Sequence, residues 1–258
     1  MSELTATSAK PSDVTGPGLA SHDIWIFGYG SLMWRPDFAY EVRARAVVDG
    51  YHRAFCIRST HHRGTDQRPG LVLGLDRGRS CTGIAYRVSH ANAPAILAYL
   101  RQRELIYGVY RETVVTARLS IEVGTVPGAG TVHPTVQALA FTVEREHPSY
   151  VGVLPLARQA GIIRSARGVS GNNLDYLFNT VRLLVDLGIR EPDIQRVAAL
   201  AGPIAARRSG GDYARASVAA LRKSLAGKRP ALQPLPISDL RRFGYRLRLG
   251  QRVQQTSD

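Results

Sequence analysis

The chain has 258 residues, of which 44% are hydrophobic, and this composition excludes a fibrous or fully disordered protein. Lys and Arg number 34 against 20 Asp and Glu, which gives a formal net charge of +14 at pH 7. A surplus of this size indicates nucleic acid, an anionic membrane surface or an anionic small molecule as a partner. All but three of the basic residues are arginines. Because GC-rich codons also produce such a composition, its meaning depends on where the charges lie.

The first part of the chain carries a leader and then strand patterns. Residues 1–21 are rich in Ser, Thr, Pro, Gly and Ala and lack the apolar stretch of a signal peptide, so we expect a flexible leader. Residues 44–59 predict one strand, or two strands that turn at Asp49-Gly50. A turn at residues 76–78 joins the strands predicted at residues 71–75 and 81–88. Residues 61–70 predict a loop. The six predicted strands are residues 24–27, 44–59, 71–75, 81–88, 110–119 and 136–143.

Two helices are predicted from apolar spacing and a proline near the start. Residues 93–104 carry Pro94 in the first turn, and Glu104 falls at or near the helix end. Residues 192–205 also begin with a proline and contain Gly202-Pro203, where a kink is expected.

The clearest helix covers residues 172–187, which carry one continuous apolar stripe. Asn172 is expected to cap this helix, Asp175 suits its positive N-terminus, and Gly188 ends it. Strands that are close in sequence, followed by helices, predict an α+β fold with a mixed or antiparallel sheet.

The positive charge is concentrated in the last quarter of the chain. Residues 190–258 hold 14 Lys and Arg against 5 Asp and Glu, a balance of +9, while the preceding 189 residues hold 20 against 15. Residues 209–258 therefore predict a weakly folded basic extension, with a short helix at residues 214–225.

The sequence also bears on compartment. No run approaches the ~18 apolar residues of a membrane span. Cys56 and Cys81 are the only cysteines and lie in strand-like runs. We interpret them as buried free thiols of a cytoplasmic protein.

A glycine-rich loop, Gly28 to Trp34, follows the first predicted strand. Its backbone N–H groups suit an anion cradle or an oxyanion hole, although an ordinary turn at a strand end has the same composition. The loop lacks the Gly-Lys-Ser/Thr ending of a phosphate loop and the third glycine of a dinucleotide site. A nucleophile elbow at Ser31 is also excluded, because Met33 stands where its last glycine belongs.

Metal and thiol chemistry are poorly supported by the sequence. No spaced set of Cys and His is present, and the adjacent His61 and His62 would point apart on an extended backbone. We interpret the pair as loop or surface residues and Cys56 as a core residue. The sequence therefore predicts no metal site.

Two carboxylates, Glu104 and Glu112, lie near one helix–strand junction beside arginines. Such residues usually form solvated surface pairs. Glu104 differs because Leu105, Ile106 and Tyr107 follow it. Partial desolvation by these neighbours would raise its pKa and suit proton exchange near neutral pH.

These features together resemble the ChaC-like γ-glutamylcyclotransferases, in particular the glutathione-specific branch. The similarity covers residues 22–208, the expected catalytic domain. In the second motif, His61 replaces the family's Asp. The matching segments, in order, are Ile26 to Trp34, Ser59 to Thr65, Tyr99 to Glu104, Tyr150 to Gly152 and Ser170 to Phe178.

The resemblance implies a small mixed sheet that closes toward a barrel with helices around it. It also implies conversion of glutathione to 5-oxoproline and cysteinylglycine without a metal or cofactor. Glu104 matches the family's catalytic Glu, whereas Glu112 matches no catalytic position. The backbone N–H groups of Tyr29, Gly30, Ser31 and Leu32 are expected to line the γ-glutamyl pocket, and the hydroxyl of Tyr176 to hold the substrate.

Two alternatives remain open at this point. One keeps the chemistry but takes other γ-glutamyl amino acids or γ-glutamylamines as substrates. The other is a binding protein whose basic tail, residues 209–258, contacts nucleic acid or acidic lipid. The tail has only three aromatic residues, Tyr213, Phe243 and Tyr245, and we interpret this sparse set as no aromatic platform of the kind that single-strand binders use, which disfavours that form of the second alternative.

Overall fold

The computed structural model describes residues 22–122, 131–202, 245–246 and 254–255. The predicted leader, the predicted helix at residues 214–225 and nearly all of the basic extension lie outside these described residues. In chain order the elements are β1 (Ile24–Gly28), a 3-10 helix (Ser31–Met33), β2 (Val42–Ser59), β3 (Gly70–Val88), α1 (Ala93–Glu104), β4 (Tyr110–Glu122), β5 (Thr131–Val132), β6 (Thr135–Val143), α2 (Leu156–Ser165), β7 (Arg167–Gly168), β8 (Gly171–Asn172), α3 (Asn173–Asp186), α4 (Pro192–Ala201), β9 (Tyr245–Arg246) and β10 (Gln254–Gln255).

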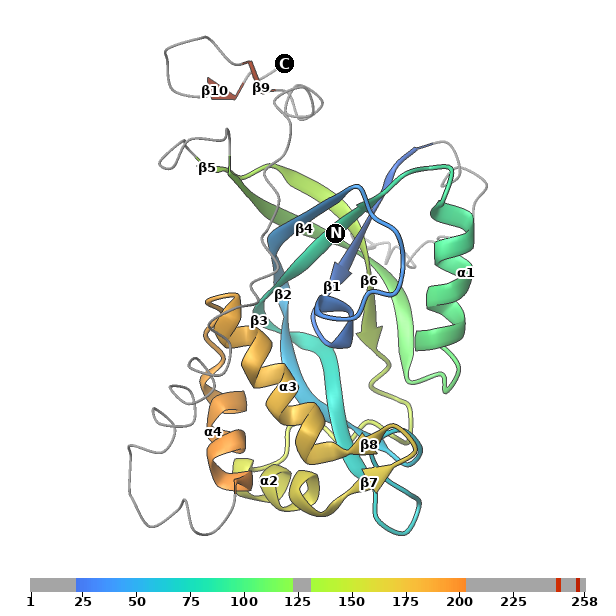
Figure 1. Ribbon diagram of the computed structural model, residues 1–258, viewed down its shortest axis with the longest axis vertical. Helices are drawn as coiled ribbons and strands as arrows, with labels where there is room; N and C mark the ends of the chain where they lie inside the picture. Colours follow the sequence, from blue (N-terminus) through green and yellow to red (C-terminus); the bar gives the residue numbers. More distant parts are fainter. Residues whose placement is uncertain (1–21, 123–130, 203–244, 247–253, 256–258) are drawn as a thin grey trace, which may run out of the picture.

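Five strands close into a small barrel, which confirms the predicted mixed sheet of an α+β protein (Figure 1). β1 pairs antiparallel with β3 and parallel with β6, and β2 and β4 complete the ring through antiparallel pairings. Every residue of β1 is buried, as expected for a short apolar strand inside a closed sheet. The loop that follows Gly28 therefore begins in the interior of the protein.

Strands β2 and β3 form one long ribbon. Of the two alternatives for residues 44–59, the structure shows the single strand, because β2 continues past Asp49-Gly50 through a register shift between Asp49 and Tyr51. Gly50 has φ +82°, so its conformational freedom serves an irregularity within the strand rather than a chain reversal. The turn predicted at residues 76–78 is wrong. A Cβ on Gly78 would lie 2.1 Å from Nδ1 of His52, so glycine here makes room for a ring across the ribbon.

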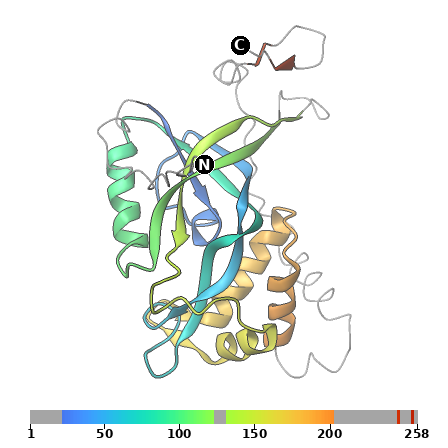
Figure 2. The same cartoon turned by 180° about the vertical axis from the view of Figure 1, so that it is seen from behind.

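The helices lie on two sides of the sheet. Figures 1 and 2 show α1 on one side of the barrel and α2, α3 and α4 together along the far part of the β2–β3 ribbon. α1 has the predicted bounds and buries Ile96, Leu97 and Leu100 against β1 and β3. α2 was not predicted, and its ten residues include Gly161, which has low helix propensity.

The boundaries of the last two helices differ slightly from the prediction. Asn172 occupies the N-cap position of α3, but its side chain donates to Asp175 Oδ2 across 3.1 Å instead of accepting a backbone N–H. Gly188 follows the helix with φ +63°, as expected for a glycine after a helix end. α4 ends at Ala201 with Gly202 as its C-cap, so the predicted kink is the end of the helix.

Asn173, the first residue of α3, fixes that helix to the ribbon. Its fully buried side chain accepts a hydrogen bond from Leu71 N and donates one to Leu71 O, each across 2.7 Å. A side-chain amide that pairs with both backbone groups of one strand residue sets position and direction together. The helix face that follows, with Tyr176 one turn later, is thereby held against β3.

Cys56 and Cys81 are buried free thiols, as predicted. Burial raises the pKa of Cys56 to about 12 and that of Cys81 to about 11. Within the described residues, no helix is both long enough and apolar enough to cross a membrane.

Candidate active site

Two buried side chains donate hydrogen bonds to the backbone carbonyl groups of the loop that follows β1. Tyr86 donates its hydroxyl to Leu32 O and Met33 O across 2.9 and 3.1 Å. Arg53 donates to Tyr29 O and to Thr82 O, and it forms an ion pair with Glu191 at the start of α4. Figure 1 shows the 3-10 helix of this loop between α1 and α3. The carbonyl groups of the loop are therefore anchored in the barrel.

Glu104 is the last residue of α1, as predicted, and its side chain is 17% exposed. Burial raises the pKa of the Glu104 carboxyl above its ordinary value, and the positive charge of Arg103 acts in the opposite direction. The Nε of Arg103 lies 3.2 Å from Glu104 Oε1. The same guanidinium donates from Nη2 to Ser31 Oγ across 3.0 Å. One side chain thus connects the predicted carboxylate to the predicted loop.

Two of the three residues expected to desolvate Glu104 do not bury it. Ile106 and Tyr107, which follow it, are 65% and 47% exposed. The charge of Glu104 acts on the buried Tyr29 and Tyr176 and on the partly buried Tyr110. The family resemblance named Tyr29 and Tyr176, whereas Tyr110 was not predicted.

The three tyrosines converge on one open strand edge. Among the described residues, residues 70–74 of β3 pair with β2 alone, which leaves backbone groups on the other side of the strand unpaired by the sheet. Tyr110 donates its hydroxyl to Leu73 O across 2.7 Å. The Leu73 backbone also lies at the hydroxyl of Tyr176, and the Leu75 backbone at that of Tyr29. Two phenol groups therefore lie at Leu73 in this gap, and that of Tyr29 lies at Leu75, where pairing with β6 begins.

Tyr176 brings α3 to the loop. A Cβ built on Gly30 would lie 3.8 Å from the Tyr176 hydroxyl, and the rings of Trp34 and Tyr176 have centroids 6.1 Å apart. Burial raises the pKa of Tyr176 to about 12, so its hydroxyl is protonated at neutral pH and can donate a hydrogen bond. The structure thus brings together the four predicted loop residues, Glu104 and Tyr176.

Glu112 occupies a different environment. It accepts two hydrogen bonds from Arg101, from Nε across 2.6 Å and from Nη2 across 3.0 Å. This bidentate pair engages both carboxylate oxygens. The two carboxylates that look alike in the sequence are therefore distinct: Glu112 is fully paired, whereas Glu104 lies among phenol groups.

The two adjacent histidines do not point apart, contrary to the prediction. Residues 60–63 form a bend, and the ring centroids of His61 and His62 lie 5.0 Å apart. Tyr107, three residues after Glu104, lies 6.0 Å from the first ring and 5.9 Å from the second. Both histidines are exposed, as predicted, and they join the loop after β2 to the loop after α1.

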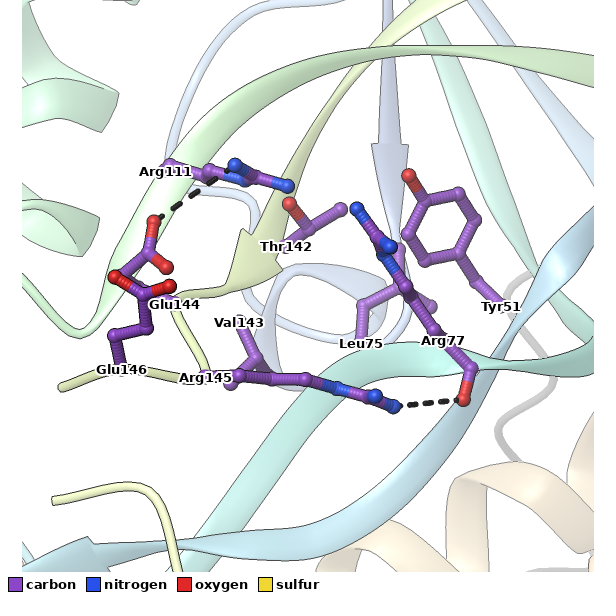
Figure 3. Close-up of a pocket in the computed structure, with 9 residues that line it drawn as sticks. All are labelled: Tyr51, Leu75, Arg77, Arg111, Thr142, Val143, Glu144, Arg145 and Glu146. Carbon is purple, nitrogen blue, oxygen red and sulfur yellow. Dashed lines mark hydrogen bonds and ion pairs between the residues drawn. The ribbon is translucent and has the colours of Figure 1, made fainter. Parts of the chain in front are cut away.

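Figure 3 shows a cavity of about 200 Å³ that contains none of the predicted site residues. Three arginines and two glutamates line much of it, and Arg111 pairs with Glu144 across 3.8 Å. Leu75 is its link to the site, because the same residue's backbone lies at the Tyr29 hydroxyl. The cavity is therefore a neighbour of the Glu104 cluster and not part of it. No group of three or more potential metal-ligating side chains occurs within the described part of the chain.

Sequence reasoning missed Arg53, Arg103 and Tyr110. Arg103 is adjacent to Glu104 in the predicted motif, and that adjacency is the only signal the sequence offers for any of them. Arg53 and Tyr110 contact partners 24 and 37 residues away. Their roles are visible only after the strands are paired.

Comparison with known proteins gives a consistent result. A family model described as ChaC-like protein matches residues 24–202. A glutathione-specific γ-glutamylcyclotransferase of Escherichia coli is 36% identical over 168 residues, which cover 65% of this chain and 68% of the relative. Glutathione-specific γ-glutamylcyclotransferase 1 of Rattus norvegicus is 39% identical over 67% of this chain and 73% of its own.

Solved structures share the fold. The crystal structure of a yeast γ-glutamylcyclotransferase specific to glutathione superposes with a TM-score of 0.60 at 21% identity. The match covers 70% of this chain and 96% of the yeast chain.

Proposed function

Because the chain belongs to the ChaC-like protein family, we propose that it is a γ-glutamylcyclotransferase that converts glutathione to 5-oxoproline and cysteinylglycine. The substrate class follows the names of the E. coli and rat relatives. The observation that carries the proposal is the partly desolvated Glu104 carboxylate, connected through Arg103 to the Ser31 loop. The buried free thiols Cys56 and Cys81 support a cytoplasmic location, where glutathione is available and thiols stay reduced.

The reaction is intramolecular, so the protein's first task is to fold the γ-glutamyl chain. The α-amino nitrogen attacks the γ-carbonyl carbon, a C–N bond closes the five-membered lactam, and the amide bond to cysteine breaks. Holding the two reacting atoms of one molecule in contact removes much of the entropic barrier. We assign this task to the backbone N–H groups of Tyr29, Gly30, Ser31 and Leu32 and to the Tyr176 hydroxyl. The same N–H groups stabilise the oxyanion that forms on the γ-carbonyl oxygen.

The second task is proton transfer, which we assign to Glu104. An α-amine is largely protonated near neutral pH, so the carboxylate accepts a proton from the attacking nitrogen. It then delivers this proton to the departing cysteinyl nitrogen. The attacking nitrogen loses a second proton as it becomes the lactam N–H, and the released cysteinyl amine gains one as it becomes an ammonium, so the protons balance. No water is consumed, because the α-amine attacks the γ-carbonyl in its place. A carboxyl whose pKa is raised by burial performs both steps better than an ordinary surface carboxylate. We assign to Arg103 the task of holding this carboxylate in position beside Ser31.

The test is direct. Purified protein is incubated with glutathione, and 5-oxoproline and cysteinylglycine are measured by mass spectrometry. Equimolar release of both products, abolished in Glu104→Gln, supports the proposal. Hydrolysis to glutamate, or no turnover of any γ-glutamyl compound, contradicts it. Parallel assays with γ-glutamylalanine and a γ-glutamylamine decide between glutathione and the wider substrate range.

A further inference from the structure

One cation beside the site keeps its best hydrogen-bonding side unused. Arg63 lies in the loop after β2 and is partly buried. Its Nη1 donates to Ser170 O across 2.6 Å and to Asn172 O across 3.3 Å, so both hydrogens of this nitrogen are engaged. Its Nε and Nη2 have no hydrogen-bond partner among the described residues. The Nε–Nη2 side is the side that binds a carboxylate through two parallel bonds.

The charge of Arg63 is also without an ion-pair partner among the described residues. The charge of Asp175 acts on Arg63, but this carboxylate forms no ion pair with it and accepts a hydrogen bond from Asn172. Burial lowers the pKa of Arg63 from its ordinary value, as expected for a partly desolvated cation without a bound anion. Such a guanidinium is prepared for an anionic ligand.

The scaffold fixes this guanidinium in place. The backbone of the Arg63 loop pairs with the β7–β8 hairpin through Val169 N to His61 O and Ser170 N to His62 O, each across 3.0 Å. The guanidinium carbon lies 5.3 Å from the centre of the Tyr176 ring, so the face of that ring supports it. A preorganised cation of this kind loses little entropy when it binds an anion.

The distance to the reaction centre suits the far end of the substrate. The Tyr176 hydroxyl approaches Gly30 in the loop assigned to the γ-glutamyl group, and the Tyr176 ring face contacts Arg63. Cysteinylglycine comprises two residues and extends at most about 7 Å beyond the scissile bond. Its terminal carboxylate can therefore reach from the loop at the Tyr176 hydroxyl to Arg63 at the face of the same ring.

The other buried or bonded cations of the site are already occupied. Arg53 donates to Tyr29 O and Thr82 O and pairs with Glu191. Arg103 contacts Glu104, Ser31 and the carbonyl of Arg35. Neither presents a free bidentate side. We therefore propose that Arg63 is the specificity residue that binds the glycyl carboxylate of glutathione. This inference rests on the proposed function, and it assigns the end of the substrate farthest from the γ-glutamyl group to Arg63.

The experiment compares two substrates that differ only at that carboxylate: glutathione and glutathione monoethyl ester, esterified on glycine. The ratio of their kcat/KM values is the readout, because it does not depend on the fraction of correctly folded enzyme. For the wild-type protein we expect glutathione to be preferred by about 10- to 100-fold, the range for a charge-assisted hydrogen-bonded pair. Arg63→Gln should bring the ratio close to 1 by slowing glutathione and leaving the ester nearly unchanged. Arg63→Lys, which keeps the charge and loses the planar fork, should fall between them.

Arg68→Gln is the matched control, because Arg68 lies exposed in the same loop and, among the described residues, forms hydrogen bonds only through its backbone, both with Thr65. It should leave the ratio at its wild-type value. A wild-type ratio near 1, or an unchanged ratio in both Arg63 variants, would overturn the assignment of Arg63 while leaving the cyclotransferase activity standing. If Arg63 instead bound the α-carboxylate of the glutamyl group, both substrates would slow equally and the ratio would not change. Absence of turnover of either substrate by the wild-type protein would contradict the proposed function itself.

Discussion

The Arg103 guanidinium donates to the Ser31 hydroxyl across 3.0 Å, and its Nε lies 3.2 Å from the carboxylate of the neighbouring Glu104. Ser31 follows the first strand of the barrel, and Arg103 ends a helix that lies outside it. The contact therefore sets the distance between the loop assigned to the substrate and the group assigned to proton transfer. Arg103 Nη1 also donates to the carbonyl groups of Arg35 and Pro36, so the same guanidinium binds a longer part of the loop.

The role of Glu104 is tested by replacing it with Gln, which keeps its shape and removes the titrating group. We expect kcat for glutathione to fall by at least ~10²-fold, as is typical for loss of a general acid–base. Glu112→Gln is the control, because Glu112 is engaged by Arg101 and lies outside the tyrosine cluster. It should retain most of the activity. Steady-state rates of 5-oxoproline release distinguish the two variants, and equal losses would remove Glu104 from the mechanism.

The buried Glu104 carboxyl should also affect stability in a pH-dependent manner. Because its pKa is raised in the folded protein, the folded state holds this proton more tightly than the unfolded chain does. The resulting stabilisation is complete below the pKa of the unfolded-state carboxyl and is lost as the pH rises through the folded-state value. Glu104→Gln cannot ionise, so its free energy of unfolding should exceed that of the wild-type protein by more at pH 7 than at pH 4. Urea unfolding at the two pH values measures this difference, and a difference that shrinks with rising pH would show that Glu104 is not desolvated.

Arg103 should act as a positioning residue with a measurable electrostatic effect. Its charge opposes the rise in the Glu104 pKa, so Arg103→Gln should move the acid limb of the kcat/KM profile to higher pH. We expect kcat to fall by about 10-fold as the carboxylate loses its fixed position. Ser31→Ala keeps the charge and should leave the acid limb in place.

Arg35→Gln removes an equal charge from an exposed side chain that pairs with Asp37. It should change neither kcat nor the position of the acid limb of the kcat/KM profile. An acid limb that stays in place in Arg103→Gln would reduce Arg103 to a structural role.

Asn173 should be important for stability because its buried amide serves both backbone groups of Leu71. Asn173→Ala leaves a buried donor and a buried acceptor unpaired, and we expect the free energy of unfolding to fall by about 2–4 kcal/mol. Asn172→Ala, at the exposed neighbouring position, should cost less than about 0.5 kcal/mol. Denaturant midpoints compare the two, and equal midpoints would show that the Leu71 hydrogen bonds do not hold α3 in place.

Local sequence determined the elements whose signals lie within a few residues. An unbroken apolar run produced β1, and the spacing of Ile96, Leu97 and Leu100 fixed α1, with Glu104 at its end. These predictions are confirmed because strand and helix patterns depend on neighbours close along the chain. Fold class followed from the order of the elements, and the family followed from the order of short motifs.

Tertiary structure decided what the glycines do and what surrounds the reactive group. Gly50 and Gly78 looked like turn residues, but both lie within long strands, at the register shift where β2 and β3 continue past them. Glu104 is buried and acts electrostatically on tyrosines from the loop after β1, from β4 and from α3, whereas Ile106 and Tyr107, which follow it, are exposed. Both outcomes depend on contacts between segments far apart in the chain, and burial and strand pairing exist only after those segments meet. The sequence by itself thus identified the carboxylate and the loop, while only the fold set the environment in which that carboxylate holds its proton.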